Sequence, residues 1–377
     1  MIYLDHNATT PVRPEVREAM WPYLGEEFGN PSSRHGPGRR AREAVERARG
    51  QIARLLACDP AEIHFTSGGT EADNWALRGT SASSQGSVVV SSVEHHAVLH
   101  AAGELARAGR EVVVLPVDGA GRVDPERVLE ASEGAAVVSL ILANNETGTI
   151  QPVAGIGAVL RQRGVPFHVD AVQAFGKIPT RVDDLEADLV SLSAHKINGP
   201  KGVGALYVRS GTSLEPWQVG GGHEHGLRAG TENVAAIVGF GAAAAIRREE
   251  MASQERRHGR LRDRLESALR ERIGDVVVHG HRVHRLSNTL NLSFRGVEAE
   301  AILVGLDLEG ICASSGSACT EGAADPSHVL LAMGVEPRLA AGAVRFSLGW
   351  GNDEAGIDRV VEVLPAIVAR LRDLSVF

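Results

Sequence analysis

The segment Ser193-Ala194-His195-Lys196 offers a candidate nucleophile. Lys196 is one of only three lysines in the chain, and it follows the apolar run 187–192, which is typical of a buried strand. Burial disfavours a charged ammonium, and the neutral amine that results attacks aldehydes to form Schiff bases. The same pattern also fits a lysine that leaves a strand end and reaches solvent. This motif alone therefore leaves both interpretations open.

A glycine-rich turn, Ser67-Gly68-Gly69-Thr70, joins a predicted strand to a predicted helix. Glycines let backbone N–H groups approach an anion, and a helix N-terminus favours negative charge. Many strand–helix turns have this composition, and a plain helix cap at Thr70 is the commoner interpretation. The turn indicates an anion-binding site only in combination with other polar groups at strand ends.

Further polar side chains follow neighbouring predicted strands. Asp170 ends the run 165–170, with Gln173 directly after it, while His95 and Asn145 each follow an earlier apolar run. A carboxylate at the carboxyl end of a core strand lies where α/β proteins bind ligands, and it can hold the protonated ring nitrogen of pyridoxal phosphate. A histidine there can stack on a ring and move protons. The residues that we expect to converge at this sheet edge are Gly69, Thr70, His95, Asn145, Asp170, Gln173, Ser193, His195 and Lys196.

Two residues in the last third of the chain are candidates for substrate chemistry. Arg345 is a charge inside the apolar run 344–348, and either a substrate carboxylate or an internal ion pair would satisfy it. Cys319 lies among small residues, which predicts a mobile loop with an accessible, reactive thiol. A packed, inert thiol is the alternative, and it is the interpretation we favour for Cys58 and Cys312.

The elements that must position these residues follow an alternating pattern between about residues 60 and 210. Apolar runs predict strands at 62–67, 88–92, 111–117, 136–142, 166–170, 188–193 and 203–208. Helical patterns such as 70–78 and 96–108 separate them, and an amphipathic helix with Ala41, Val45 and Ile52 on one face precedes them. Runs that are apolar on both faces favour a mostly parallel sheet covered by helices on both sides, the α/β class.

The pattern changes near residues 245–255, where we place a domain boundary. An alanine-rich helix at 234–246 and a charged helix at 256–273 flank that point, and Pro365 is expected to kink or restart the last helix. We expect an N-terminal segment, 1–13, that packs with the small domain; a large α/β domain, 14–250; and a smaller α+β domain, 251–377, that carries the Cys319 loop.

Composition excludes several classes of function. The 377-residue chain carries a net charge of −8 and a pI near 6.0, which argues against nucleic acid as a partner. No stretch approaches the roughly 20 apolar residues of a membrane helix, and the N-terminus lacks the features of a signal peptide, so we expect a cytoplasmic protein. Three cysteines predict neither a disulfide framework nor a zinc site.

Motifs along almost the whole chain resemble the cysteine desulfurases, which are fold-type I pyridoxal phosphate enzymes of the class V aminotransferase group. The matching segments are Tyr3-Leu4-Asp5-His6-Asn7-Ala8-Thr9-Thr10, 28–33, 65–71, 144–148, 168–171, 193–196, 220–224, 314–320 and 345–349. The segment around Cys319 is similar to the iron–sulfur and nitrogen-fixation branch of that family.

The resemblance implies how the cofactor's ring is held. Lys196 would form the Schiff base with pyridoxal phosphate and then shuttle protons. His95 would stack on the ring and act in acid–base steps, and Asp170 would pair with the ring nitrogen. Gln173 and Asn145 would bond the ring and its phenolate oxygen.

The resemblance also implies how the phosphate and the substrate are bound. The phosphate contacts would come from Gly69, Thr70, Ser193, His195 and Thr231, the last from the other subunit of a homodimer. Arg345, helped by Asn7 and Asn145, would bind the carboxylate of L-cysteine. Cys319 would take the substrate's sulfur as a persulfide, leaving L-alanine.

Other activities remain open at this point. A selenocysteine lyase or a class V aminotransferase would use the same fold, although an aminotransferase has no use for the Cys319 thiol. A non-catalytic sulfur-trafficking scaffold is a more remote alternative. The expected acceptor is an iron–sulfur scaffold or a thiolation protein. No resident metal is expected, and Cys319 is a candidate ligand of a transient iron–sulfur cluster only.

Overall fold

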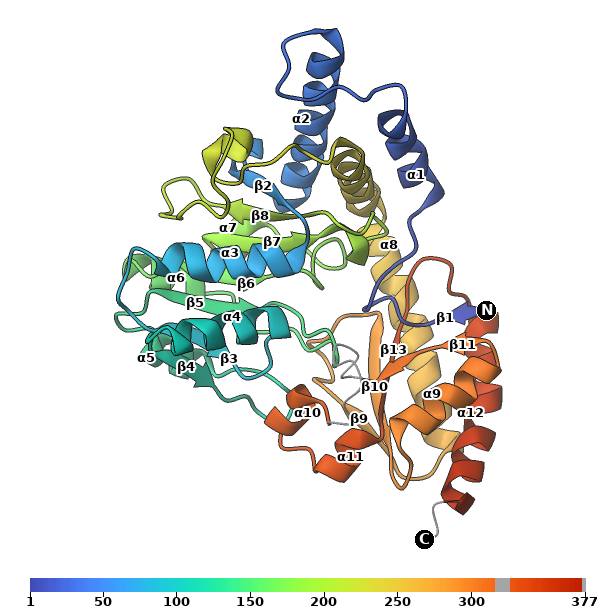
Figure 1. Ribbon diagram of the computed structural model, residues 1–377. Coiled ribbons are helices and arrows are strands. Elements are labelled where there is room, and N and C mark those ends of the chain that lie inside the picture. Colours follow the sequence, from blue (N-terminus) through green and yellow to red (C-terminus); the bar gives the residue numbers. More distant parts are fainter. Residues whose placement is uncertain (316–325, 375–377) are drawn as a thin grey trace.

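A seven-stranded sheet forms the centre of the computed structural model, which describes residues 1–315 and 326–374 (Figure 1). The strand order is β2-β8-β7-β6-β5-β3-β4. The strands are β2 (Ile63–Thr66), β3 (Val88–Ser91), β4 (Val112–Leu115), β5 (Val137–Ile141), β6 (Phe167–Asp170), β7 (Leu189–Ser193) and β8 (Gly204–Val208). Only β8 runs antiparallel to its neighbours, because the short connection from β7 leaves no room for a parallel crossover. The mostly parallel sheet expected from the sequence is confirmed.

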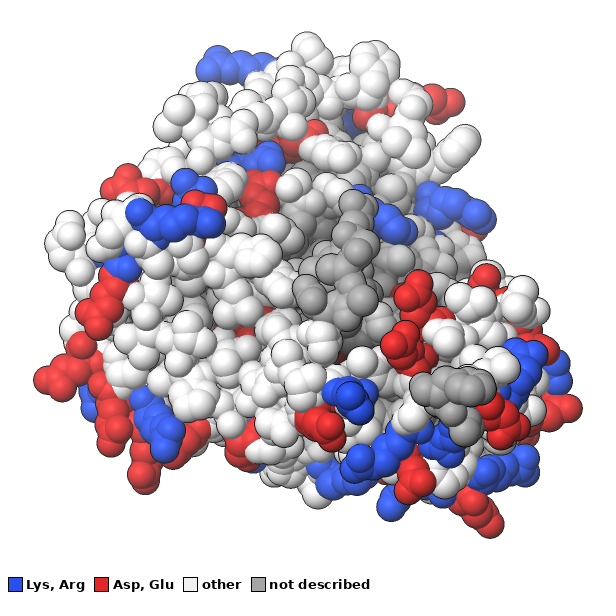
Figure 2. All heavy atoms as spheres, turned by 60° about the horizontal axis from the view of Figure 1, so that its bottom comes forward, with Lys and Arg blue, Asp and Glu red and all other residues white. Residues whose placement is uncertain are grey.

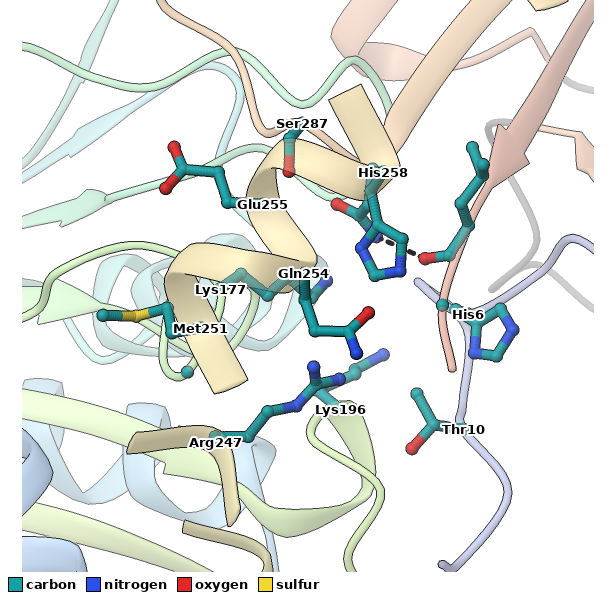
Figure 3. A pocket seen from close by; sticks show the side chains of 14 residues that line it. His6, Thr10, Lys177, Lys196, Arg247, Met251, Gln254, Glu255, His258 and Ser287 are labelled. Atoms are coloured by element: carbon teal, nitrogen blue, oxygen red, sulfur yellow. Dashed lines mark hydrogen bonds between the residues drawn. The ribbon is translucent and has the colours of Figure 1, made fainter. Parts of the chain in front are cut away.

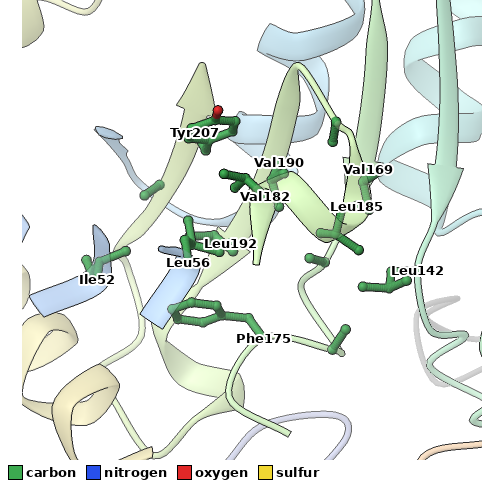
Figure 4. Close-up of a cluster of buried hydrophobic side chains, with 14 of the residues drawn as sticks. Ile52, Leu56, Leu142, Val169, Phe175, Val182, Leu185, Val190, Leu192 and Tyr207 are labelled. Atoms are coloured by element: carbon green, nitrogen blue, oxygen red, sulfur yellow. The ribbon is translucent and has the colours of Figure 1, made fainter. Parts of the chain in front are cut away.

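Helices cover both faces of this sheet, because alternate strand residues point to opposite sides. Val88 and Val90 of β3 pack into the cluster that includes α3 (Gly69–Ser81) and α4 (His96–Arg107). Val89, between them, joins the larger cluster on the other face. Figure 4 shows part of that cluster, where residues of α2 meet side chains of β7 and β8. Both faces of the sheet are thus covered mainly by apolar side chains, with a buried hydrogen-bonded group of Ser139, His168 and Ser191 among them.

The amphipathic helix predicted before the sheet is α2 (Gly36–Leu56), and its apolar stripe, including Val45 and Ile52, is buried as expected. It packs along α8. The shorter elements of this half are α1 (Pro14–Met20), η1 (Trp21–Leu24), η2 (Pro60–Glu62), α5 (Pro125–Ala131), α6 (Ile156–Gln162), α7 (Val182–Leu185), η3 (Ala194–Lys196) and η4 (His223–Gly226).

A single helix, α8 (Val234–Arg272), replaces the two helices expected on either side of residues 246–256. The prediction of a break was wrong because that stretch, although it changes from apolar to charged, contains no glycine or proline and is rich in good helix formers. The start of α8 belongs to the core around α2, and its end belongs to a separate core near the C-terminus. The proposed domain boundary therefore lies inside a continuous helix.

The C-terminal part builds a four-stranded antiparallel sheet in the order β12-β13-β10-β9, packed against α9 and α12. Its elements are β9 (Val276–His279), β10 (Thr289–Phe294), α9 (Ala299–Leu308), β12 (Ser314–Ser315), α10 (His328–Ala332), α11 (Pro337–Ala341), β13 (Ala343–Ser347) and α12 (Glu354–Leu374). Pro365 lies within α12, which continues as one helix on both sides of it.

The N-terminal segment crosses between the two sheets. Its strand β1 (Ile2–Tyr3) pairs in parallel with β11 (Ile311–Cys312) of the C-terminal part. A few residues later, the N–H and the hydroxyl of Thr10 both donate to the carbonyl of His195, beside the end of β7. Residues 5–10 are therefore held between both parts of the chain. Within the part of the chain that the structure describes, no helix is both long and apolar enough to cross a membrane.

Candidate active site

A pocket of about 370 Å³ lies at the carboxyl ends of the parallel strands. Its lining residues are Asn7, Ala8, Gly69, Thr70, Asp73, His95, Ile141, Asn145, Asp170, Val172, Gln173, Ser193, His195, Lys196 and Arg345. Every site residue predicted from the sequence is present there except two. Thr231 is exposed outside the pocket, and Cys319 lies outside the described residues.

Lys196 enters the pocket from η3, the tight turn that directly follows β7. Its Nζ donates to the backbone carbonyls of Asn7 at 2.6 Å and Ala8 at 2.8 Å. The candidate nucleophile is thus half-buried and held against the N-terminal segment, so the interpretation as a solvent-directed lysine does not hold.

Three buried carboxyl groups form what we call the acidic wall: Asp73 and Asp170, which line the pocket, and Glu94, which does not line it. Burial raises the pKa of Asp170 to about 6, although Lys196 and the bond that its Oδ1 accepts from the Val172 N–H act against this rise. Burial also raises the pKa of Glu94 to about 8 and that of Asp73 well above its ordinary value. Asp73 Oδ1 has no hydrogen-bond partner among the described residues. This wall therefore favours a ligand group that carries positive charge.

His95 is the N-cap of α4, and its Nδ1 accepts the Ala97 N–H at 3.1 Å. Burial, and then the nearby Lys196 charge, lower the pKa of His95 to about 4. The ring is therefore neutral, with its proton on Nε2. Burial lowers the pKa of His195 to about 4 as well, and that ring contacts the Thr9 hydroxyl through Nδ1 at 3.1 Å.

The glycine-rich turn provides a close backbone approach at the start of α3. A Cβ placed on Gly69 would meet Cγ2 of Val172 at 2.6 Å, so only glycine fits there. The helix cap is Gly68 rather than Thr70, and within the described part of the chain no side chain caps this helix start. The N–H groups at this helix start are therefore available to an anion beside Ser193.

Arg345 reaches the pocket from β13 in the C-terminal part and is paired internally. Its Nη2 lies 2.8 Å from Asp5 Oδ1, and its Nη1 donates to the Asn145 carbonyl at 3.0 Å. Its Nε has no partner among the described residues. Asn7 uses its amide N–H groups on the Asn145 carbonyl and Thr289 Oγ1. The internal ion pair left open by the sequence is present, and Arg345 still offers Nε to a ligand.

Sequence reasoning missed Asp5, Asp73 and Lys177 in and around this site. Asp5 orients Arg345, and Asp73 faces the pocket from a helix side that is otherwise apolar, a sign of a buried acid. Lys177 is one of the three lysines and lies four residues after Gln173, which was a usable signal. Its contacts with distant residues could not be read from the sequence.

The fold and the pocket match a known class of proteins. The family profile described as "Aminotransferase class-V" matches residues 2–360, so the chain belongs to that family. A "Cysteine desulfurase" of Trichormus azollae is 49% identical, over 100% of this chain and 95% of the relative. A solved "NifS-like protein" is 38% identical with a TM-score of 0.92, covering 98% of this chain and 99% of that one.

A third comparison concerns a structure that contains an amino acid. The structure described as "SspA in complex with cysteine" is 35% identical with a TM-score of 0.82, covering 92% of this chain and 99% of that one. Together, these similarities place the chain among the NifS-like cysteine desulfurases of the class V family. The family, the fold class and the activity predicted from the sequence are thereby confirmed.

Proposed function

We propose that the pocket binds pyridoxal phosphate and that the enzyme passes the sulfur of L-cysteine to Cys319. The observation that carries this proposal is the convergence of five polar strand ends, Lys196 and Arg345 on one pocket. Such a convergence supplies an amine, an anion site and a carboxylate site within a single cavity.

The donor set fits each part of pyridoxal phosphate. The uncapped start of α3, with Gly69 and Thr70, suits the phosphate, as do Ser193 and His195 beside it. The acidic wall suits the protonated ring nitrogen, with Asp170 as its partner. His95 would lie against the ring, and the amides of Asn145 and Gln173 would bond the ring and its phenolate oxygen.

When bound, pyridoxal phosphate supplies the electron sink that makes the substrate's α-hydrogen acidic. Lys196 would bond the cofactor in the resting enzyme and then carry this proton on Nζ. Arg345, with Asn7 and Asn145 beside it, would orient the carboxylate of L-cysteine. The neutral His95 ring can exchange a proton through Nε2.

The sulfur transfer balances without an added oxidant. The carbon–sulfur bond of L-cysteine breaks, and a sulfur–sulfur bond forms at Cys319. The carbon receives a proton and leaves in L-alanine, so the carbon is reduced as the sulfur is oxidised. A thiolate is the attacking species, which requires the Cys319 thiol to lose its proton first.

A homodimer would complete the phosphate site. Three exposed side chains form an apolar surface near the N-terminus. They are Trp21, Leu24 and Phe28, which are 71%, 66% and 80% exposed. Ser32 Oγ lies 3.2 Å from His223 Nε2, so the segment that leads to Thr231 adjoins this surface. A second copy packed here would cover the apolar side chains and bring Thr231 toward the neighbouring pocket.

The acceptor that we propose for the persulfide is a protein, either an iron–sulfur scaffold or a thiolation protein, met in the cytoplasm. On the face shown in Figure 2, basic and acidic side chains are interspersed without a continuous basic band, as the net charge of −8 suggests. A surface of this kind offers little to a nucleic acid backbone. We assign no resident metal, and we keep the domain limits 14–250 and 251–377 as a proposal.

An absorption spectrum with an activity assay tests the proposal. Addition of pyridoxal phosphate should give a Schiff-base band that L-cysteine perturbs, with equal amounts of alanine and sulfide formed in the presence of a reductant. Cys319→Ala should abolish sulfide while the band remains, and Cys58→Ala is the matched control. Unchanged sulfide release by Cys319→Ala would refute the assigned nucleophile. The absence of any band would refute the cofactor assignment.

A further inference from the structure

Lys177 lies on the opposite side of Lys196 from the cofactor pocket. Both lysines line a cavity of about 20 Å³, together with Arg247, His6 and His258 (Figure 3). That volume holds about one water molecule, so no larger ion can sit between these groups. His6 Nδ1 and His258 Nε2 have no partner among the described residues, and such lone pairs suit a water. The one carboxylate that lines this cavity, Glu255, is exposed and forms no ion pair with Lys177 within the described residues.

The amine of Lys177 is bonded to two amide oxygens and to no carboxylate. Its Nζ donates to Gln173 Oε1 at 2.7 Å and to Asn7 Oδ1 at 3.0 Å. It makes no ion pair within the described ranges 1–315 and 326–374. Burial, and then the charges of Lys196, Arg247 and Arg345, hold the pKa of this amine well below its ordinary value. Both amide oxygens accept from this amine, which acts as a donor in each of the two bonds.

This arrangement decides which way two amides face. An amide side chain can present either its oxygen or its nitrogen, and the choice follows from its partners. Because Lys177 supplies donors, Gln173 must turn Oε1 toward it, which leaves Nε2 to donate to the Asn7 carbonyl at 2.8 Å. Gln173 Nε2 keeps a second N–H for the pocket. Asn7 is fixed likewise, since its Oδ1 also accepts from Asn288 Nδ2 at 3.2 Å.

We propose that Lys177 is a positioning residue, which holds the Gln173 amide so that it offers N–H groups, and not its oxygen, to the cofactor site. This inference rests on the proposed function, because it assumes an anionic oxygen of pyridoxal phosphate as the acceptor. A flipped Gln173 would present Oε1 to that oxygen and repel it. Lys177 does not line the cofactor pocket, so its effect on the cofactor would run through Gln173, while its bond to Asn7 bears on the substrate side of the site.

The test is a double-mutant cycle on the dissociation constant of pyridoxal phosphate. Lys177→Met keeps the length of the side chain and removes both donors. We expect it to weaken cofactor binding roughly five- to tenfold, the value of about one hydrogen bond. In a Gln173→Ala background the same change should have little further effect, because the amide that Lys177 orients is gone. Lys201→Met, at an exposed lysine, is the matched control.

Three outcomes are informative. An unchanged dissociation constant in Lys177→Met would overturn the proposal. So would an equal loss with and without Gln173, because a merely structural lysine would act in both backgrounds; the melting temperature of the cofactor-free variants reports that case directly. If the unmodified enzyme formed no Schiff-base band, the proposed function would fail instead, and this result is visible before any variant is made.

Discussion

The acidic wall and a basic wall, which lines the neighbouring small cavity and shares Lys196 with the pocket, show two ways to bury charge. The basic wall consists of Lys177, Lys196 and Arg247. The carboxyl groups of the acidic wall find partners near in sequence, such as Val172 for Asp170 and Ser91 for Glu94. Most groups of the basic wall bond to distant residues, as Lys196 does to Asn7 and Arg247 to Asn198, although Lys177 also bonds to the nearby Gln173. The acidic wall thus depends more on local contacts, and the basic wall more on contacts between distant segments.

Burial pushes both walls toward neutrality. The pKa values of the acids rise and that of Lys177 falls, because neither wall has an adequate counter-charge within the described residues. Of the basic wall only Lys196 lines the pocket at the strand ends, whereas Lys177 and Arg247 line the neighbouring cavity. A ligand with a cationic ring nitrogen would therefore supply opposite charge to the acidic wall alone.

The largest expected effect comes from Lys196, which lies between the walls. Lys196→Ala should reduce alanine formation by at least about 10³-fold, because it removes both the Schiff-base amine and the group that carries the proton. The rate of alanine release and the Schiff-base band are the measurements. Lys201→Ala, at an exposed position, should resemble the unmodified enzyme. A surviving band in Lys196→Ala would mean that Lys177 is the reactive amine and that the walls are assigned wrongly.

Asp170→Asn should lower kcat by about 10²–10³-fold, since a preorganised charge beside the ring nitrogen is lost. Asp73→Asn is the more informative of these two variants. Burial raises the pKa of Asp73 well above its ordinary value, which disfavours its charged form, so an isosteric amide should change kcat less than about threefold. Steady-state measurements of kcat for both variants test this predicted difference. Equal losses would show that the acidic wall holds more than one negative charge.

The contrast between the walls also explains what the sequence could predict. The strand ends that hold Gly69, His95, Asp170 and Lys196 are local features, so parallel-strand geometry alone placed them at one edge. The continuity of α8 was missed because a change of composition was taken for a break. The bonds of Asp5 to Arg345 and of Lys177 to Asn7 were missed because these partners lie far away along the chain, and no local pattern encodes such contacts.

Asp5→Asn tests a contact between the N-terminal segment and the C-terminal part. Asp5 holds Arg345 through Nη2, and loss of this charge should loosen the guanidinium. We expect the KM for L-cysteine to rise roughly tenfold with kcat little changed, which is the scale of one hydrogen bond to a charged group. The cofactor band should be unaffected. A lower KM would show instead that Asp5 competes with the substrate carboxylate for Arg345.

The smallest effect that we predict is a difference in how the acidic wall and the basic wall change the stability of the protein with pH. The pKa of Glu94 is raised to about 8, so the folded protein must keep this proton while the unfolded chain loses it near its ordinary value of 4.5. The stability associated with Glu94 is therefore full below about pH 4.5 and is lost as the pH rises toward 8. Lys177, whose pKa is lowered, acts in the opposite direction, because its contribution grows as the pH rises. Glu94→Gln should remove only the first of these trends.

The melting temperature of the cofactor-free protein is the measurement for this prediction. The difference between Glu94→Gln and the unmodified protein should shift in favour of the variant between pH 5 and pH 8, by roughly 2–4 °C. Glu43→Gln, at an exposed carboxylate on α2, should show no such shift. A difference that does not vary with pH would mean that Glu94 is ionised in the folded protein. The acidic wall would then require a cation within reach, and its contrast with the basic wall would disappear.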